Sequence, residues 1–173
     1  GAHGAVEDEV ALFGILKQLA DEGIAIIAAA GNGGTTECFW PAAMATDRNL
    51  LVRVTSVGAT NPTGGRVAVF SNAGPWVSTY ECGVAVVGTM PTTLEGSARG
   101  DVAVAAGPHR ARSTPDPDCY GTGFGVWSGT SFSAPCAAGR VASLLSREAS
   151  PTDPAARAKR ASAAVAKVVG AGG

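Results

Sequence analysis

A serine in the segment GTSFSAPCAAG, residues 129–139, stands where a helix is expected to begin. The first N–H groups of a helix have no intrahelical partner, and they carry a partial positive charge. Ser131 in such a place could attack a carbonyl carbon while its own N–H stabilises the oxyanion that forms. A serine that only caps the helix would produce the same local pattern. At this point both interpretations of Ser131, nucleophile and cap, are open.

A second chemical candidate, Asn32, follows the most apolar stretch of the chain. The run IAIIAAA at 24–30 has no polar alternation, which is typical of a strand covered on both faces in a parallel sheet. Ligands of open α/β sheets bind beyond the carboxyl ends of the strands. The Asn32 side chain carries a neutral NH2 donor that could face an oxyanion, and the glycines around it allow a substrate backbone to approach. An ordinary turn asparagine is the alternative.

The elements that must position these two residues alternate between helix and strand. Apolar side chains at three- and four-residue steps predict a helix over 5–22 that Gly23 ends. Stretches rich in β-formers and bounded by Gly and Pro predict further strands at 50–59, 66–71 and 76–87. Two more helices are expected, over 131–148 and 152–168. This order predicts an α/β domain with a mostly parallel sheet.

The boundaries of this domain are predicted from composition. Thr152 or Asp153 can cap the last helix, with Pro154 at its first position. Residues 91–125 are polar and rich in Gly and Pro, so we expect a surface excursion that contains a small hairpin. The domain is expected to cover 1–168, and 169–173 are expected to form a disordered tail.

Composition excludes several classes of function. The net charge is −1, which gives no electrostatic basis for binding nucleic acid or an anionic membrane. No apolar run approaches the roughly 18 residues of a membrane span. Few lysines and many Gly, Pro, Ser and Thr residues in the expected loops favour a secreted or cell-surface protein. The four cysteines have no C-x-x-C spacing, allow three full disulfide pairings and do not indicate which one forms.

The segment around Ser131 resembles the serine motif of the subtilisin family (peptidase S8), G-T-S-x-[SA]-x-P-x-x-[STAVC]-[AG], at every specified position. AIIAAAGNGG is similar to that family's strand before its oxyanion asparagine, and Trp40-Pro41-Ala42 resembles its Y-P-A turn. TSVGATNPTGGRVAVFSNAGPWV resembles its V-G-A and F-S-x-x-G block. The blocks follow the family order across residues 5–147. The resemblance implies a subtilisin-like three-layer αβα fold, of which this chain would be the C-terminal part of the catalytic domain.

The resemblance also implies roles for individual residues and a substrate class. Ser131 would be the nucleophile and Asn32 the side-chain oxyanion donor of a serine endopeptidase acting on peptides or proteins. Ala29, Ala30 and Gly31 would form one wall of the pocket for the substrate residue before the scissile bond, and Gly129 and Thr130 would lie beside that pocket. Calcium often accompanies this family, but no acidic cluster here has convincing ligand spacing. Asp116 and Asp118 are the only faint candidates, so no metal or other cofactor is predicted.

The chain departs from the family pattern in its catalytic base, for which no matching motif is found. The family's histidine lies in an H-G-T-x-V-A-G motif, and an earlier aspartate orients it. His3 is followed by Gly4 but not by the rest of that motif, and His109 lies in the expected excursion. We therefore expect the His and Asp to come from an N-terminal part of the domain, in cis or in trans, and this chain to be inactive alone.

Cys136 replaces a histidine that is common in the family, and we expect it to be buried in the helix as a free thiol. A cysteine nucleophile is a weaker interpretation, because no histidine lies in a recognisable partner motif. Two other functions remain as alternatives. One is a pseudoprotease or peptide-binding module that keeps the groove without the triad. The other is an unrelated α/β protein, although the G-x-S-x-G elbow of α/β-hydrolases is absent.

Overall fold

The computed structural model describes residues 6–63, 65–94, 103–104, 112–113 and 120–171. The chain divides into two compact units, and each is described by itself. The first comprises Gly1–Val84 and Ser128–Gly173, and the second comprises Ala85–Trp127. Both Ser131 and Asn32 belong to the first unit. The excursion expected at 91–125 falls inside the second unit.

A parallel sheet lies at the centre of the first unit. Its strands are β1 (Ile27–Ala29), β2 (Thr55–Thr60) and β3 (Thr79–Cys82), in the order β1-β2-β3. Their carboxyl ends meet at one edge, because all three strands run in the same direction. β1 is shorter than the apolar run at 24–30, since only its last part pairs with β2.

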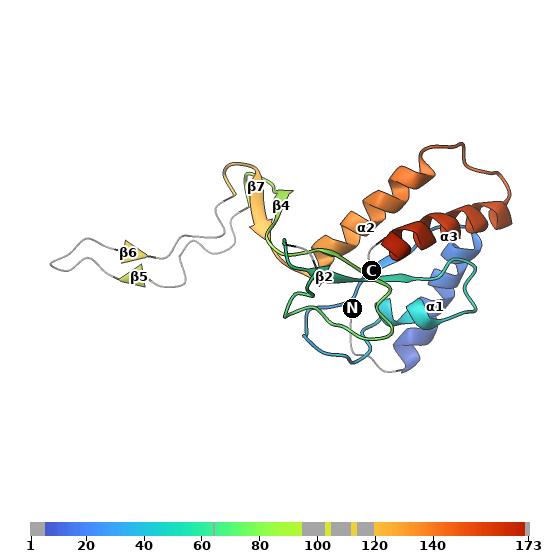
Figure 1. The fold of residues 1–173 in the computed structure, drawn as a ribbon, viewed down its shortest axis with the longest axis horizontal. Coiled ribbons are helices and arrows are strands. Elements are labelled where there is room, and N and C mark those ends of the chain that lie inside the picture. Colours follow the sequence, from blue (N-terminus) through green and yellow to red (C-terminus); the bar gives the residue numbers. More distant parts are fainter. Residues whose placement is uncertain (1–5, 64, 95–102, 105–111, 114–119, 172–173) are drawn as a thin grey trace. The chain divides into compact units, whose positions relative to one another are not determined.

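Helices cover the sheet. They are α1 (Val6–Asp21), the 3-10 helix η1 (Ala42–Thr46), α2 (Thr130–Leu145) and α3 (Pro154–Ala171). Figure 1 shows α2 and α3 side by side on one side of β2, with α1 apart from α2. The sheet is parallel and the fold is α/β, as the sequence predicts.

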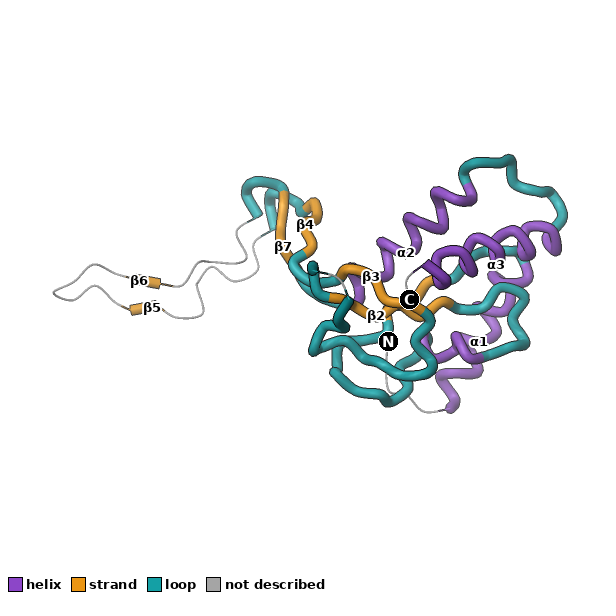
Figure 2. Tube along the Cα trace, in the orientation of Figure 1, coloured by secondary structure: helices purple, strands orange, loops and turns teal. Residues whose placement is uncertain are grey.

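Two apolar clusters fill the spaces next to the sheet. On the side of α2, Val57 packs with Ala137 and Val141, joined by Ala164 and Val168 of α3. The other cluster joins the buried residues of α1 and η1 to Ala28, Ala30, Val52, Val54 and Trp76. Ile27 belongs with the first cluster and Ala28 with the second, as expected where successive strand residues face opposite sides. Figure 2 shows the orange strands of this unit among the purple helices.

One predicted strand is wrong, and another is two separate strands. Residues 66–71 form no strand, and only Val67 makes an isolated bridge, to Thr60. The run at 76–87 divides into β3 and a separate strand, β4 (Val86–Thr89), which belongs to another sheet. Ala85, which lies between them in the sequence, has a φ of 53°. Local β propensity cannot show such a break, because it does not specify the partner of a strand.

The predicted beginning of the last helix is confirmed. The Ala156 N–H donates to Asp153 Oδ2 at 2.8 Å, and Pro154 is the first residue of α3. The helix runs to Ala171, so residues 169–171, which the sequence places in the tail, are helical. Residues 172–173 lie outside the described part of the chain.

The second unit contains two short antiparallel pairs. β4 pairs with β7 (Phe124–Trp127), and β5 (Ala103–Val104) pairs with β6 (Arg112–Ser113). The second pair is the small hairpin that the sequence predicts within 91–125. Among the helices of the described residues, none has both the length and the apolar character needed to cross a membrane.

Candidate active site

The carboxyl edge of the parallel sheet brings together segments that are far apart in sequence. Asn32 lies just after β1, Gly83 lies just after β3, and α2 begins beside both. The Gly129 N–H, at the start of α2, donates to the Gly83 carbonyl at 2.8 Å. The helix that carries Ser131 is therefore fixed to the edge at which α/β proteins bind ligands.

The Asn32 side chain is held by the first residue of α2. Its Oδ1 accepts hydrogen bonds from the backbone N–H and from the hydroxyl of Thr130, both at 2.9 Å. A backbone N–H can only donate, so the atom facing it must be the amide oxygen. The NH2 group of Asn32 therefore points away from Thr130. Within the described residues this NH2 group has no hydrogen-bond partner, and the Asn32 residue is exposed.

Thr130 joins the two segments through a single hydroxyl group. Its Oγ1 accepts from the Gly31 N–H at 3.0 Å and donates to Asn32 Oδ1. Thr130 is 1% exposed, so its hydroxyl is shielded from water, and its bond with Gly31 is buried. Both the donor and the acceptor capacity of the hydroxyl are used. The orientation of the Asn32 amide is thus fixed by a residue nearly a hundred positions away.

Ser131 is the second residue of α2, and it does not cap the helix. The N-cap is Gly129, which has no side chain, and Ser131 lies inside the helix one residue after Thr130. The Ser131 side chain is exposed, and its Oγ has no hydrogen-bond partner in the described part of the chain. Its N–H belongs to the first turn, where no intrahelical acceptor exists. The hydroxyl and this N–H therefore have no hydrogen-bond partner among the described residues, and Thr130, which binds Asn32, is the neighbouring residue.

The residues predicted to wall the substrate pocket lie at the same edge. Ala30 is fully buried, Gly31 and Gly129 are buried, and Ala29 is half-buried. A Cβ atom added at Gly129 would lie 3.3 Å from Asn32 Nδ2, so the Asn32 side chain lies close to the Gly129 backbone. The structure therefore brings these residues next to Asn32. Their contact with a substrate stays a prediction.

Gly83 and Asn72 help to build this edge, although the sequence analysis did not single them out. A Cβ atom at Gly83 would lie 2.1 Å from Ser133 Oγ and 2.9 Å from the Gly129 carbonyl, so only a glycine lets α2 approach β3 this closely. Asn72 is fully buried and contacts the loop that carries Asn32. In the F-S-N-A-G sequence at 70–74, Asn72 is the one residue with a side-chain amide. This amide was the sequence signal that could have identified Asn72.

Four residues that were considered as a base or as calcium ligands, and were not predicted to serve as either, fall outside the described part of the chain: His3, His109, Asp116 and Asp118. Among the residues that are described, no group of three or more His, Cys, Asp or Glu side chains could hold a metal ion. The structure therefore does not test the predictions about the catalytic base or about calcium.

Cys136 was expected to be buried, and this is wrong. It carries a free thiol and is exposed, because α2 turns Ser133, Ala137 and Val141 toward the sheet and leaves Cys136 beside that face. Partial burial of the thiol raises its pKa, and the nearby Glu81 and Cys82 raise it further. A raised pKa lowers the fraction of thiolate at neutral pH, and the thiolate is the nucleophilic form. The structure thus gives no support to Cys136 as a nucleophile.

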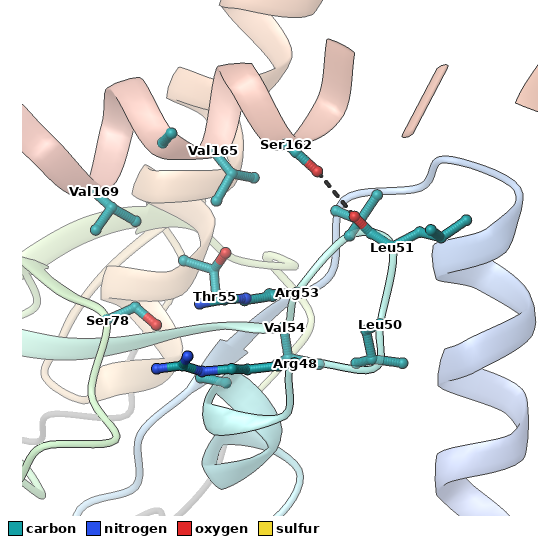
Figure 3. Close-up of a pocket in the computed structure, with 13 residues that line it drawn as sticks. Arg48, Leu50, Leu51, Arg53, Val54, Thr55, Ser78, Ser162, Val165 and Val169 are labelled. Atoms are coloured by element: carbon teal, nitrogen blue, oxygen red, sulfur yellow. Dashed lines mark hydrogen bonds between the residues drawn. The ribbon is translucent and has the colours of Figure 1, made fainter. Parts of the chain in front are cut away.

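A separate hollow of about 460 Å³ lies at the opposite end of the sheet (Figure 3). Thr55, the first residue of β2, and Ser78, the residue before β3, line it together with Val165 of α3. In Figure 3, Arg48 and Arg53 extend across it, and Ser162 donates to the Leu51 carbonyl at 3.1 Å. It lies at the amino ends of the strands and contains neither Ser131 nor Asn32. The candidate active site is therefore the carboxyl edge.

Comparison with known proteins shows which family and which solved structures this chain is similar to. The sequence profile of the subtilase family, peptidase S8, matches residues 3–171. No curated protein sequence matches the chain. Solved structures also share the fold, among them three proteases. A prenylagaramide maturation protease, PagA, has a TM-score of 0.52 at 23% identity, and the match covers 83% of this chain and 41% of that one.

The other two structures are a cold-adapted subtilisin-like serine proteinase and a lanthipeptide protease. The first has a TM-score of 0.54 at 21% identity, covering 87% of this chain and 41% of that one. The second has a TM-score of 0.51 at 16% identity, covering 83% of this chain and 46% of that one. This chain therefore spans less than half the length of each of the three structures.

Proposed function

We propose, from the premise that this chain belongs to the subtilase family, that Ser131 is the nucleophile of a serine endopeptidase and Asn32 is its oxyanion donor. Family membership supports the serine protease function. The observation that supports the assignment of residues is the Asn32 amide, whose oxygen is bound by Thr130 at 2.9 Å. Its NH2 group is left without a partner among the described residues, beside the start of the helix that presents Ser131.

The proposed reaction is acyl transfer in two steps. Ser131 Oγ attacks the carbonyl carbon of the scissile peptide bond, and a general base takes the hydroxyl proton. The carbonyl oxygen becomes an oxyanion, which accepts hydrogen bonds from Asn32 Nδ2 and the Ser131 N–H. The amine leaves with the proton, and water then hydrolyses the ester on Ser131. In this proposal, the hydrogen bonds to the oxyanion stabilise the transition state strongly, because both donors are held in position before the charge develops.

The proposed substrate is a peptide or protein chain whose residue before the scissile bond lies against the backbone of Ala29, Ala30 and Gly31 and of Gly129 and Thr130. These residues are small apart from Thr130, and the Thr130 hydroxyl is already bound to Gly31 and Asn32. The wall would therefore recognise the substrate mainly through backbone contact and shape. We also propose that the protein acts outside the cell, on the basis of its composition.

The base and its carboxylate partner are proposed to come from sequence outside this chain. Neither histidine lies in the family motif, and the chain spans 41% of the length of two matched proteases. Within the described residues, β1 pairs on one side only, with β2, so its other edge could accept further strands. The N-terminal part of the domain, in cis or in trans, is the proposed partner.

A fluorophosphonate probe on the full-length protein tests this proposal. We expect the probe to label Ser131, and we expect Ser131→Ala to remove the label and the peptidase activity together. Ser133→Ala is the matched control, because Ser133 is two residues away on the same helix but fully buried. This control should retain the label. If the probe labels Ser131→Ala as strongly as it labels the wild type, the proposed role of Ser131 is disproved.

A pseudoprotease remains the second candidate, and the lack of a histidine in the family motif favours it. A pseudoprotease would bind peptides at the same edge without reacting with the probe. If the full-length protein also lacks the motif histidine and binds peptide without hydrolysing it, the second candidate replaces the first.

A further inference from the structure

Asn72 is a fully buried polar residue that binds both sides of the turn carrying Asn32. Its Oδ1 accepts from the Gly33 N–H at 2.9 Å and from the Thr35 N–H at 3.3 Å. Its Nδ2 donates to the Ala30 carbonyl at 2.9 Å. These partners lie before and after Asn32 in the sequence, so one side chain connects the two arms of the turn.

The backbone of the same segment continues this connection. The Asn72 N–H donates to the Gly31 carbonyl at 2.9 Å, and the Gly34 N–H donates to the Phe70 carbonyl at 2.8 Å. Gly31 has a φ of 96°, and a Cβ atom added there would lie 2.6 Å from Asn72 Nδ2. The turn is therefore packed directly against the Asn72 carboxamide, with no room for a side chain between them.

Asn72 is itself anchored to the central strand. Ser71 Oγ accepts from the Ala59 N–H of β2 at 2.9 Å and donates to the Asn72 carbonyl at 3.0 Å. The turn that carries Asn32 is thus fixed, through Asn72 and Ser71, to the most buried part of the sheet. Thr130 fixes the rotation of the Asn32 amide, whereas Asn72 fixes the backbone from which that amide projects.

We infer that Asn72 is a positioning residue for the oxyanion donor. The inference rests on the proposed function of Asn32 and goes beyond it, since Asn72 contacts only the backbone of the turn. An oxyanion donor works only if it is held at the place where charge develops, and small displacements are costly. A carboxamide suits this position because it supplies a donor and an acceptor that takes two bonds. A carboxylate would lose the donor to Ala30, and an aliphatic side chain would lose all three bonds.

The test is a double-mutant cycle in the full-length protein. Asn72→Ser is expected to lower kcat by about 10- to 10²-fold while KM stays within about twofold, because an interaction that forms only in the transition state is weakened. The upper limit is the loss caused by removing the donor itself, about 10²–10³ in kcat, a magnitude measured on the equivalent asparagine of subtilisin. In an Asn32→Ala background, Asn72→Ser should change kcat by less than about twofold, since it acts through Asn32.

Trp76→Phe is the matched control. Trp76 Nε1 donates to the Thr36 carbonyl at 3.0 Å, so it holds the same loop beyond the turn itself. This variant should lose stability but keep its kcat at a temperature where both variants are folded. A kcat loss in Trp76→Phe equal to that in Asn72→Ser, or an undiminished loss in the Asn32→Ala background, would overturn the inference.

Hydrogen exchange separates this inference from the proposed function. In the full-length protein, Asn72→Ser should increase exchange of the Gly33 and Thr35 amides at least tenfold more than Trp76→Phe does. If the wild type hydrolyses no peptide, the proposed function fails, and the exchange result still decides whether Asn72 holds the turn. Unchanged exchange at Gly33 would overturn the inference whatever the activity.

Discussion

At the scale of single residues, the site depends on polar atoms that have one orientation available to them. Thr130 can bind Gly31 and Asn32 at once only if its hydroxyl accepts from the first and donates to the second. The same requirement sets the Asn32 amide with its oxygen toward Thr130. Two other buried hydroxyls, those of Ser133 and Thr79, have no partner within the described residues. They are exceptions to the rule that buried polar groups are hydrogen-bonded, and a mutation can measure how such a hydroxyl affects stability.

Ser133→Ala is expected to leave the stability unchanged or to raise it by about 1 kcal/mol. The substitution removes a buried hydroxyl that makes no hydrogen bond and leaves the rest of the side chain in place. Urea unfolding of the wild type and the variant measures the difference. The exposed Ser143→Ala on the same helix is the control and should lie within about 0.5 kcal/mol of the wild type. A loss of more than 1 kcal/mol in Ser133→Ala would mean that the hydroxyl has a partner.

At the scale of elements, the ends of the helices determine where the site residues lie. α2 begins at the carboxyl edge, where Gly83 permits its close approach and Gly129 binds the chain after β3. Its other end is held by Arg160 of α3, whose guanidinium donates to the carbonyls of Leu145, Glu148 and Ala149. These carbonyls lie at and just beyond the end of α2, where no intrahelical donors remain. α3 therefore fixes the far end of the helix that presents Ser131.

Arg160→Ala is expected to lower the free energy of unfolding by about 1.5–3 kcal/mol, the range for hydrogen bonds to a charged group. Arg160→Lys should recover only part of the loss, because an ammonium group cannot reach several carbonyls with the planar geometry of a guanidinium. Arg147→Ala is the control, since Arg147 is exposed and makes no hydrogen bond to the described residues. Thermal or urea unfolding that shows the same small effect for Arg160 and Arg147 would contradict this role.

At the scale of the whole molecule, the proposed function requires further strands at the β1 edge of the sheet. β1 pairs only with β2 among the described residues, and Ile24, just before it, is 47% exposed. A strand with one unpaired edge and apolar neighbours favours association with another strand. The proposed N-terminal part of the domain would cover this edge and bring the base to Ser131.

Residues 1–173 alone are expected to show no labelling by a fluorophosphonate, and addition or co-expression of the preceding part of the protein should restore it. The reason is that a serine hydroxyl is a poor nucleophile without a base. Probe labelling, measured with and without the added segment, checks this. Ser131→Ala with the added segment is the control and should stay unlabelled. Full labelling of residues 1–173 alone would show that the chain contains its own base.

The sequence alone determined the elements with strong local signals. The helix over 5–22, the apolar strand and the cap at Asp153 were predicted because periodicity, apolar runs and capping chemistry are local properties. The motifs also identified Asn32 and Ser131 as candidates, because their chemistry is carried by residue type and by the neighbours in sequence. The predictions of a strand at 66–71 and of a buried Cys136 were wrong. Strand pairing, and which side of a helix packs against the sheet, both depend on partners that are distant in sequence.

Only the tertiary structure decided which residues meet. The Thr130 hydroxyl binds Gly31 and Asn32 across 99 and 98 positions, respectively, and Asn72 reaches Gly33 across 39. No local pattern contains these pairs, because a hydrogen bond depends on separation in space, which the packing of α2 against a parallel sheet sets. The sequence thus named the candidate groups for the proposed reaction, and the fold determined which buried side chains contact them and the turn that carries Asn32.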